Sequence, residues 1–305
     1  MAREGSGETR PRTGRAIEDR RRARRAKNDL AGSGTLRRPR LHPQGEPGRL
    51  RAPLPTRVGD LPPLPPAYHA ALDHGLARLG LELDRGQRTR IDDHVRLLLA
   101  WNPAINLTAI RDPAGIAVRH VLDSLTAVPL LRTRGVERLV DMGSGGGFPG
   151  LPLAVAVPLR RALLVESVGK KAAFLRVAIE ATTWADRTSV EVAAGRAESL
   201  AASPRERGSW PAVTARAVGT LAELVELAFP LLAPEGCLVA WKRGDLDAEL
   251  AGARRAIDAL GGGTLVVLSV DLPELLGHCL VVATRTGAVP AAYPRDPRLR
   301  KREPI

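Results

Sequence analysis

Apolar residues that recur at helical spacing dominate the pattern after residue 66. Three helices are predicted in this part, with apolar faces at Leu72, Leu76 and Leu79, at 91–99, and at 118–125. The second helix is predicted to end near Pro103. The third is predicted to start at Asp112-Pro113, because a carboxylate caps free N–H groups and proline is tolerated at the first helical position. Residues 67–134 are therefore expected to form a helical region.

After Gly135 the pattern changes to short β-rich runs that alternate with helical stretches. Seven strands are predicted, at 138–141, 162–166, 190–194, 213–216, 237–242, 264–270 and 278–284. Helices fit between the first six, at 149–157, 170–182, 197–201, 219–232 and 245–260. This alternation is typical of an α/β fold with a parallel, doubly wound sheet. Too few residues separate the last two strands for a crossover, so those strands are predicted to pair antiparallel.

Charge is concentrated at the two ends of the chain. The 305 residues carry a formal net charge of +13, which suggests a polyanionic partner. Residues 1–66 hold 16 basic and 7 acidic residues, 10 prolines and no aromatic residue, so a disordered leader is expected there. Residues 293–305 hold 5 basic and 2 acidic residues, whereas 67–292 hold 25 and 24. The leader either binds nucleic acid non-specifically or is merely solvated.

Several classes of protein are disfavoured. No stretch reaches the roughly 18 apolar residues of a membrane helix, and the N-terminus lacks the apolar segment of a signal peptide. The two cysteines, Cys237 and Cys279, have no paired spacing, which argues against a disulfide framework and a zinc knuckle. A cytoplasmic monomer with no metal and no membrane partner is expected.

Candidate chemistry centres on the run from Asp141 to Gly150, where a strand leads through a glycine loop into a helix. Positions without side chains let a ligand lie against the backbone, and the N–H groups at a helix start attract its polar end. Gly145, Gly147 and Gly150 spell the G-x-G-x-x-G of dinucleotide sites. Glu166, at the end of the next strand, is expected to accept hydrogen bonds from both hydroxyls of a ribose.

Asp141 distinguishes two classes of ligand for this loop. A carboxylate at the strand end would repel a pyrophosphate, whereas S-adenosylmethionine presents an ammonium and a sulfonium cation there. The Asp141 carboxylate therefore favours S-adenosylmethionine over a nicotinamide or flavin cofactor. The structural alternative is that the glycines form only a tight turn, which Asp141 caps.

Several ordered motifs together resemble those of one family, the bacterial small-subunit ribosomal RNA guanine-N7 methyltransferases, or glucose-inhibited division protein B family. Besides the glycine loop they are Trp101-Asn102, Asn106-Leu107-Thr108, Arg119-His120-x-x-Asp123-Ser124, Glu166-Ser167-x-Gly169-Lys170-Lys171, Gly195-Arg196-Ala197-Glu198, Ala215-Arg216-Ala217, Lys242 and Tyr293-Pro294-Arg295. The resemblance covers about residues 75–305, and the leader has no counterpart in the family pattern.

The resemblance implies a fold and an activity. The expected fold is a Rossmann-like class I methyltransferase, with a seven-stranded sheet that ends in an antiparallel hairpin. The expected activity is methylation of N7 of a guanine in 16S rRNA, with S-adenosylmethionine as cofactor and the RNA or the small ribosomal subunit as partner. Its parts would be the leader 1–66, a helical region 67–134, a cofactor-binding domain 135–286 and a basic tail 287–305.

The resemblance also implies further cofactor contacts, in addition to Asp141, Gly145 and Glu166 of the glycine loop and the next strand. They are Gly143, Phe148, Ala197, Glu198 and Arg216. Ala197 and Glu198 would flank the adenine. Arg216 would hold the methionine carboxylate, with an RNA phosphate contact or a structural ion pair as the alternatives.

No catalytic base is expected, because guanine N7 carries an in-plane lone pair and is methylated without losing a proton. Phe148 and Trp241 are candidate platforms for a base flipped out of its stack. The candidate RNA contacts are Arg119, His120, Lys170, Lys171 and Arg295. Their structural alternatives are an Arg119–Asp123 ion pair, a packing role for His120 and a solvated lysine pair.

Two other functions remain open from the sequence. The glycine loop is compatible with a nicotinamide-dependent oxidoreductase. A methyltransferase-like ribosome assembly factor without catalysis would carry the same motifs.

Overall fold

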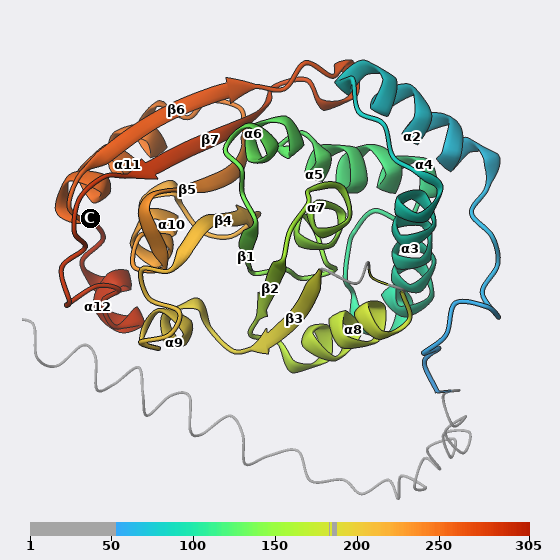
Figure 1. Cartoon of the computed structure of the whole chain (residues 1–305), viewed down its shortest axis with the longest axis horizontal. Helices are drawn as coiled ribbons and strands as arrows, with labels where there is room; N and C mark the ends of the chain where they lie inside the picture. The colour runs from blue at the N-terminus through green and yellow to red at the C-terminus, as the bar shows by residue number, and fades with distance from the viewer. Residues whose placement is uncertain (1–52, 183, 185–187) are drawn as a thin grey trace, which may run out of the picture. The chain divides into compact units, whose positions relative to one another are not determined.

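A computed structural model of the chain describes residues 53–182, 184 and 188–305. What was expected of residues 1–52 lies outside the described residues. The described chain begins with helices, in agreement with the prediction for residues 67–134 (Figure 1). These are α2 (Pro66–Leu79), α3 (Arg85–Ile105), α4 (Pro113–Ile116), the π-helix η1 (Ala117–Leu122), α5 (Asp123–Leu125) and α6 (Val128–Thr133).

A seven-stranded sheet follows, as predicted. Its strands are β1 (Arg138–Met142), β2 (Arg161–Glu166), β3 (Ser189–Ala194), β4 (Trp210–Arg216), β5 (Leu232–Arg243), β6 (Gly263–Ser269) and β7 (His278–Arg285). The strand order is β3-β2-β1-β4-β5-β7-β6, with β1 to β5 parallel and β7 antiparallel to both of its neighbours. The antiparallel final hairpin is confirmed. Strand β7 lies between β5 and β6, and its apolar side chains are buried.

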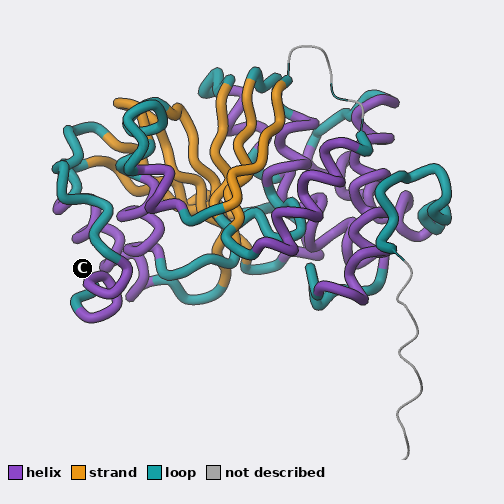
Figure 2. Tube along the Cα trace, turned by 90° about the horizontal axis from the view of Figure 1, so that it is seen from below, coloured by secondary structure: helices purple, strands orange, loops and turns teal. Residues whose placement is uncertain are grey.

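Two layers of helices cover the sheet, which Figure 2 shows between them. The helices of the second half are α7 (Gly150–Ala156), α8 (Gly169–Glu180), α9 (Ala197–Ala201), α10 (Leu221–Ala228), α11 (Asp247–Ala259), the 3-10 turn η2 (Pro273–Leu275) and α12 (Pro297–Arg302). Successive side chains of β1 point to opposite faces of the sheet, and each face has its own hydrophobic core. Leu139 packs in the core with α3, α7 and α8, and Val140 packs in the core with α10 and α11.

Two predicted helix ends are displaced in the structure. Helix α3 continues past Pro103 to Ile105, because a proline in the last turn removes only one hydrogen bond of the helix. Asn106 then ends the helix in the left-handed conformation, with its N–H bonded to the Asn102 carbonyl at 3.0 Å. Helix α10 ends at Ala228, and residue 232 already belongs to β5.

The predicted boundary of the disordered leader, at residue 66, lies too far along the chain. Residues 53–65 are part of the folded unit, since Val58 and Leu64 lie in the hydrophobic core. Trp101 Nε1 donates to the Pro55 carbonyl at 2.8 Å, and Arg96 Nη2 donates to the Val58 carbonyl at 2.9 Å. The proline-rich composition of this stretch indicated disorder, although a few of its apolar residues pack in the core.

One described segment, Pro113–Thr133, is long and apolar enough to pass for a membrane span on length and composition alone. In the structure the segment comprises four short helices rather than one. Its large apolar side chains, such as Ile116, Val121 and Leu125, are fully buried in the protein core. The apolar side chains of this segment therefore pack against the rest of the protein, as in a core helix.

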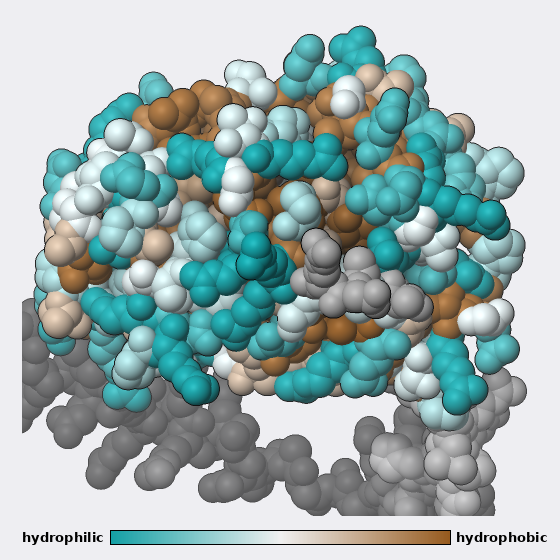
Figure 3. All heavy atoms as spheres, viewed as in Figure 1, coloured by the Kyte–Doolittle hydropathy of each residue, from teal (hydrophilic) through white to brown (hydrophobic). Residues whose placement is uncertain are grey.

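Strand β6 forms one edge of the sheet. Val266, Val267 and Leu268 are each more than a third exposed on it. Figure 3 shows apolar residues gathered along the margin where Figure 1 places β6. The site described next lies at a different edge, the one formed by the carboxyl ends of the parallel strands.

Candidate functional site

The glycine loop between β1 and α7 has one open side. Gly143 and Gly145 lie on it with φ angles of 71° and 55°, in the left-handed region that favours glycine. Gly143 is exposed. A Cβ placed on Gly145 would have only the Gly143 carbonyl within 4 Å, at 3.8 Å. A ligand can therefore lie against the backbone at these two positions.

The other side of the loop is packed against protein. A Cβ on Gly150 would lie 2.2 Å from Leu164 Cδ2, and one on Gly147 would lie 2.8 Å from His94 Nε2. Both distances are too short for any side chain. These glycines therefore serve close packing. Gly143 is exposed although a Cβ on it would lie 2.6 Å from Val218 Cγ2, and Gly145 is the open position.

His94 on α3 fixes this packed side and was not anticipated from the sequence. Its Nε2–H donates to the Gly146 carbonyl at 2.7 Å, because a carbonyl can only accept. Its Nδ1 is buried without a hydrogen-bond partner, and burial lowers the pKa of His94 to about 4. The available signal was a polar residue inside an apolar stripe, between Ile91 and Leu98.

Asp141 lies inside the protein, beneath the loop. Its Oδ1 accepts from Thr214 Oγ1 at 2.8 Å, and its Oδ2 accepts from the Gly150 N–H at 3.2 Å. Strand pairing places Thr214 directly beside it. Burial raises the pKa of Asp141 to about 6, against the effect of the hydrogen bonds from Ser144, Thr214 and Gly150. The carboxylate therefore caps the start of α7, which was the structural alternative for this residue.

Glu166, at the end of β2, joins two loops at the carboxyl edge. Its Oε2 accepts from the Gly145 N–H at 2.9 Å, and its Oε1 accepts from the Val168 N–H at 2.7 Å. The Gly195 N–H also donates to the Glu166 carbonyl, which ties in the turn after β3. The predicted acceptor is thus held rigidly at this edge, and each carboxylate oxygen keeps a second lone pair.

Phe148 is enclosed by two histidine rings. Its centroid lies 4.6 Å from that of His94 and 4.8 Å from that of His120, the latter nearly parallel at 18°. Trp241 is also buried, and its Nε1 donates to the Asp123 carbonyl at 2.7 Å. Neither ring has a free face, so the expectation that one of them stacks on a flipped base is wrong for this conformation.

Arg216, at the end of β4, is held by the π-helix η1. Its Nη1 donates to Asp123 Oδ2 at 2.9 Å and to the Arg119 carbonyl at 3.1 Å. Asp123 Oδ1 lies 3.1 Å from His278 Nδ1. The structural ion pair foreseen for Arg216 is therefore present. The predicted Arg119–Asp123 pair is wrong, because Asp123 points to the sheet while the Arg119 side chain is exposed.

His120 lies behind Arg216. A guanidinium only donates, so His120 Nδ1 accepts from Arg216 Nη2 at 3.1 Å and Nε2–H faces Thr108 Oγ1 at 2.6 Å. Burial, followed by the Arg216 charge, lowers the pKa of His120 to about 3. The ring thus has a packing role against Phe148 and Arg216, which was the structural alternative for His120, and its contact with RNA stays a prediction.

The turn after β3 carries Ala197 and Glu198, both half-buried at the start of α9. Their place next to Glu166 agrees with the expected order of contacts along the edge. The Glu198 carboxylate forms an ion pair with Arg300 of α12.

Of the remaining candidate RNA contacts, Arg295 pairs with a carboxylate inside the protein. Its Nε and Nη2 donate to Oε1 and Oε2 of the buried Glu226, at 2.9 and 2.7 Å, so the guanidinium serves the fold. Lys170 is exposed and Lys171 half-buried at the start of α8. Neither lysine forms an ion pair with any of the described residues.

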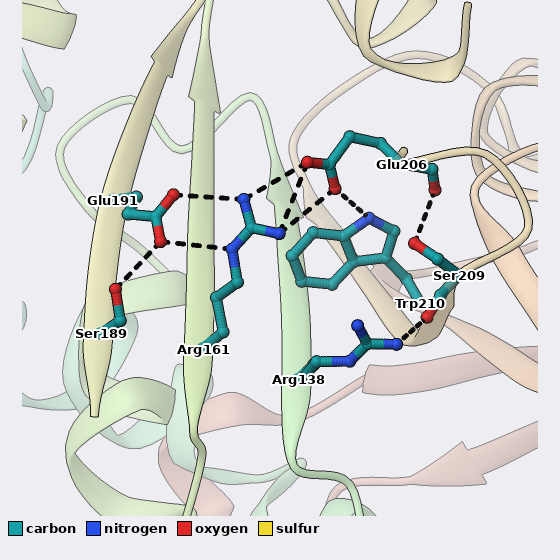
Figure 4. Close-up of polar contacts among 7 residues, drawn as sticks. All are labelled: Arg138, Arg161, Ser189, Glu191, Glu206, Ser209 and Trp210. Atoms are coloured by element: carbon teal, nitrogen blue, oxygen red, sulfur yellow. Dashed lines mark hydrogen bonds and ion pairs between the residues drawn. The ribbon is translucent and has the colours of Figure 1, made fainter. Parts of the chain in front are cut away.

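The two ends of the strands differ in how their cations are used. At the amino end, Arg161 pairs with Glu191 and Glu206, and Arg138 and Arg161 lie over opposite parts of the Trp210 indole (Figure 4). At the carboxyl end, five cations have no ion pair within the described part of the chain: Arg119, Lys170, Lys171, Arg196 and Arg243. Positive charge is thus available at the same edge as the open side of the glycine loop.

Comparison with known proteins yields a consistent result. Residues 87–274 match the model of the GidB family, described as rRNA small subunit methyltransferase G. The chain is 44% identical over 226 residues to the ribosomal RNA small subunit methyltransferase G of Roseiflexus sp. (strain RS-1), covering 74% of this chain and 95% of that protein. It is 37% identical to the protein of the same name from Dehalococcoides mccartyi (strain CBDB1), covering 77% and 98%.

Among solved structures, the chain is similar to an O-methyltransferase from Bacillus cereus in complex with SAH. The TM-score is 0.45 and the identity 18%, over 70% of this chain and 97% of that one. The family model spans more than half of this chain, and both curated relatives are matched over nearly their whole length. The chain therefore belongs to the GidB family of rRNA small subunit methyltransferase G proteins.

Proposed function

We propose that this protein transfers the methyl group of S-adenosylmethionine to N7 of a guanine in 16S rRNA, in the cytoplasm. The observation that carries the proposal is the family match over residues 87–274, which includes the complete glycine loop. Family membership favours this function over a nicotinamide-dependent oxidoreductase. The substrate is taken to be the small ribosomal subunit or its RNA.

The described residues fit an adenosine-containing cofactor. Gly145 offers an open backbone surface next to the exposed Gly143, and Glu166 is a fixed acceptor at the end of β2. Ala197 and Glu198 follow on the next turn. We assign the ribose to Glu166 and the adenine to Ala197 and Glu198. Phe148 and Asp141 support the loop from beneath.

Arg216 is the group assigned to the methionine carboxylate. Asp123 and the Arg119 carbonyl both engage Nη1, and His120 engages Nη2. The guanidinium is thus held in place before any ligand binds, which reduces the entropy that binding must overcome. Its partners also neutralise part of its charge, so Arg216 would act as an oriented donor rather than a free cation.

The chemistry requires orientation rather than proton transfer. S-adenosylmethionine would supply an electrophilic methyl group on a sulfonium. Guanine N7 already has an in-plane lone pair, so no protein group has to act as a base. His94 and His120 agree with this view, because desolvation lowers their pKa values to about 4 and about 3. The task of the protein is to align the two reactants and to exclude water.

The cations at the carboxyl edge are assigned to RNA phosphates. Lys170 and Lys171 stand at the start of α8, where the helix dipole disfavours positive charge, and no described carboxylate pairs with them. An RNA phosphate would compensate for this unfavourable location. Phosphate contacts of this kind position the RNA without reading its sequence.

Methyl mapping tests the proposed function. The full chain is incubated with labelled S-adenosylmethionine and small subunits that lack the modification, and 7-methylguanine is then located in the 16S rRNA. A single modified guanine is the expected result. Cofactor binding without methyl incorporation would favour the assembly factor, and selective binding of NAD in calorimetry would favour the oxidoreductase.

The RNA assignment has its own test. Replacing Lys170 and Lys171 with alanine should lower the dependence of log Kd for RNA on log salt concentration by roughly 1.4–1.8, because about two phosphate contacts are lost. Arg160→Ala is the matched control, since Arg160 is exposed at the opposite edge and pairs with Glu137 at 3.0 Å. Equal effects of the two changes would refute the assignment.

A further inference from the structure

The C-terminal segment of the chain returns to the edge of the proposed cofactor site. Residues 287–305, here called the C-terminal strap, include α12, which Figure 1 shows beside α9. Arg207 donates to the carbonyls of Tyr293 and Pro290, at 2.7 and 3.2 Å. Tyr293 and Ile305 pack against the core beneath α10 and α11. The strap is therefore anchored along its length.

The strongest anchor joins the strap to α10. Glu226 is buried, and it accepts three hydrogen bonds from Arg295: from the backbone N–H and from Nε at 2.9 Å each, and from Nη2 at 2.7 Å. A buried carboxylate needs such a partner, because an isolated buried charge costs several kcal/mol. Arg295 therefore determines where the following helix α12 lies.

Helix α12 places Arg300 against Glu198. Arg300 Nη2 pairs with Glu198 Oε1, and the two side chains are only 11% and 18% exposed. Among the described residues no group donates to Glu198 Oε2. One oxygen of the carboxylate is thus held by the strap, while the other remains available as an acceptor.

Arg300 is placed there at a cost in stability. Its Nε–H is buried and has no acceptor among the described residues. A buried donor without a partner typically costs about 1–3 kcal/mol, so stability alone does not account for this position. A role in orienting Glu198 does account for it.

We propose that the C-terminal strap positions Glu198 for the adenine of S-adenosylmethionine, with Arg300 as the positioning residue. The inference rests on the proposed function, which assigns the adenine to Ala197 and Glu198. Arg300 pairs with one oxygen of the carboxylate and limits its rotamers, so that Oε2 is directed before the ligand arrives. The Glu198 side chain then loses its conformational entropy when the protein folds, so this loss no longer opposes binding of the ligand.

The test is a double-mutant cycle read by calorimetric titration of the full chain with S-adenosylmethionine. Arg300→Ala is expected to weaken binding about tenfold, which corresponds to roughly 1.4 kcal/mol. In the Glu198→Ala background the same change is expected to have no further effect, because Arg300 acts through Glu198. Arg298→Ala is the matched control on the exposed side of α12 and should leave the affinity unchanged.

The outcomes separate the two proposals. A wild-type chain that does not bind S-adenosylmethionine contradicts the proposed function itself. A wild-type chain that binds, with unchanged affinity in Arg300→Ala, refutes the role of the strap alone. An equal loss in both backgrounds also refutes it, since Arg300 would then act independently of Glu198. Thermal unfolding of each variant identifies any loss that comes from misfolding.

Discussion

Single residues around the glycine loop divide into those that a ligand can reach and those that support them. Gly143 and Gly145 are reachable, whereas Asp141, His94 and Phe148 lie beneath. Two of the supporting residues, Asp141 and His94, are polar groups in buried positions, which a packed core normally avoids unless they are paired. Their cost is one mark of a site, because the fold keeps them in spite of it.

Gly145→Ala is expected to weaken binding of S-adenosylmethionine by at least about tenfold, because the added Cβ projects from the open side of the loop. The left-handed backbone adds a strain of about 1–2 kcal/mol. Gly80→Ala is the matched control, since Gly80 has a φ of 61° and nothing within 4 Å of an added Cβ. Calorimetry and thermal unfolding should show similar losses of stability in both variants and a loss of affinity only in Gly145→Ala.

His94 should make the fold sensitive to acid. Its pKa is about 4 in the folded chain and near 6.5 when unfolded, so between these pH values only the unfolded state takes up the proton. Stability from this group is complete above pH 6.5 and declines by roughly 3 kcal/mol as the pH falls to 4. The lowered pKa of His120 acts in the same direction, and the raised pKa of Asp141 opposes both below pH 6.

His94→Phe measures this contribution. At pH 7 the variant should be less stable by about 1–2 kcal/mol, because the Gly146 carbonyl loses its buried donor. Urea unfolding at pH 7 and pH 4.5 should show a smaller loss on acidification in the variant than in the wild type. The same loss in both proteins would mean that His94 is not the acid-sensitive group.

At the scale of elements, the site depends on how the helical region meets the sheet. The π-helix η1 brings Asp123 and His120 to the end of β4, where both contact Arg216. Short π-helices are rare in proteins, and those that occur are often found at functional sites. The Arg119 carbonyl of η1 also accepts from Arg216.

Asp123→Ala is expected to lower the free energy of unfolding by about 2–3 kcal/mol, because Arg216 and His278 both lose a buried partner. Affinity for S-adenosylmethionine should fall as well, since Arg216 is no longer held. Asp93→Ala removes a comparable pair with Arg96, about one fifth exposed and remote from the site, and should cost less than about 1 kcal/mol. Equal losses in urea unfolding would argue against a special role for Asp123.

At the scale of the whole molecule, bulk charge turns out to be a poor guide to the binding surface. The net charge of +13 resides mostly in residues 1–66 and 293–305. Two arginines of the second segment, Arg295 and Arg300, are used within the fold. The nearly neutral body nevertheless has five cations at the carboxyl edge of the sheet that form no ion pair with the described residues: Arg119, Lys170, Lys171, Arg196 and Arg243.

Truncation tests where the folded unit begins. A chain that starts at Pro53 should keep the thermal midpoint of the full chain, because the described core begins after that residue. A chain that starts at Ala67 should lose roughly 3 kcal/mol or more, since Val58 and Leu64 leave the core. Differential scanning calorimetry distinguishes the two. A stable Ala67 chain would contradict the packing of residues 53–65.

The sequence by itself determined the class of fold, the seven strands and the final antiparallel hairpin, because hydrophobic period and connection length are local properties. It also determined the glycine loop and its acidic neighbours, since these follow directly from strand ends. The family resemblance rested on ordered motifs that the family match then supported.

Only the tertiary structure decided which way each polar side chain faces. Asp141 turned inward to Thr214, Asp123 paired with Arg216 instead of Arg119, and the tail arginines were taken up by Glu226 and Glu198. These partners are far apart along the chain, so no local pattern specifies them. Buried charges are matched by whichever opposite charge the packing of elements brings near, and that is a property of the assembled fold.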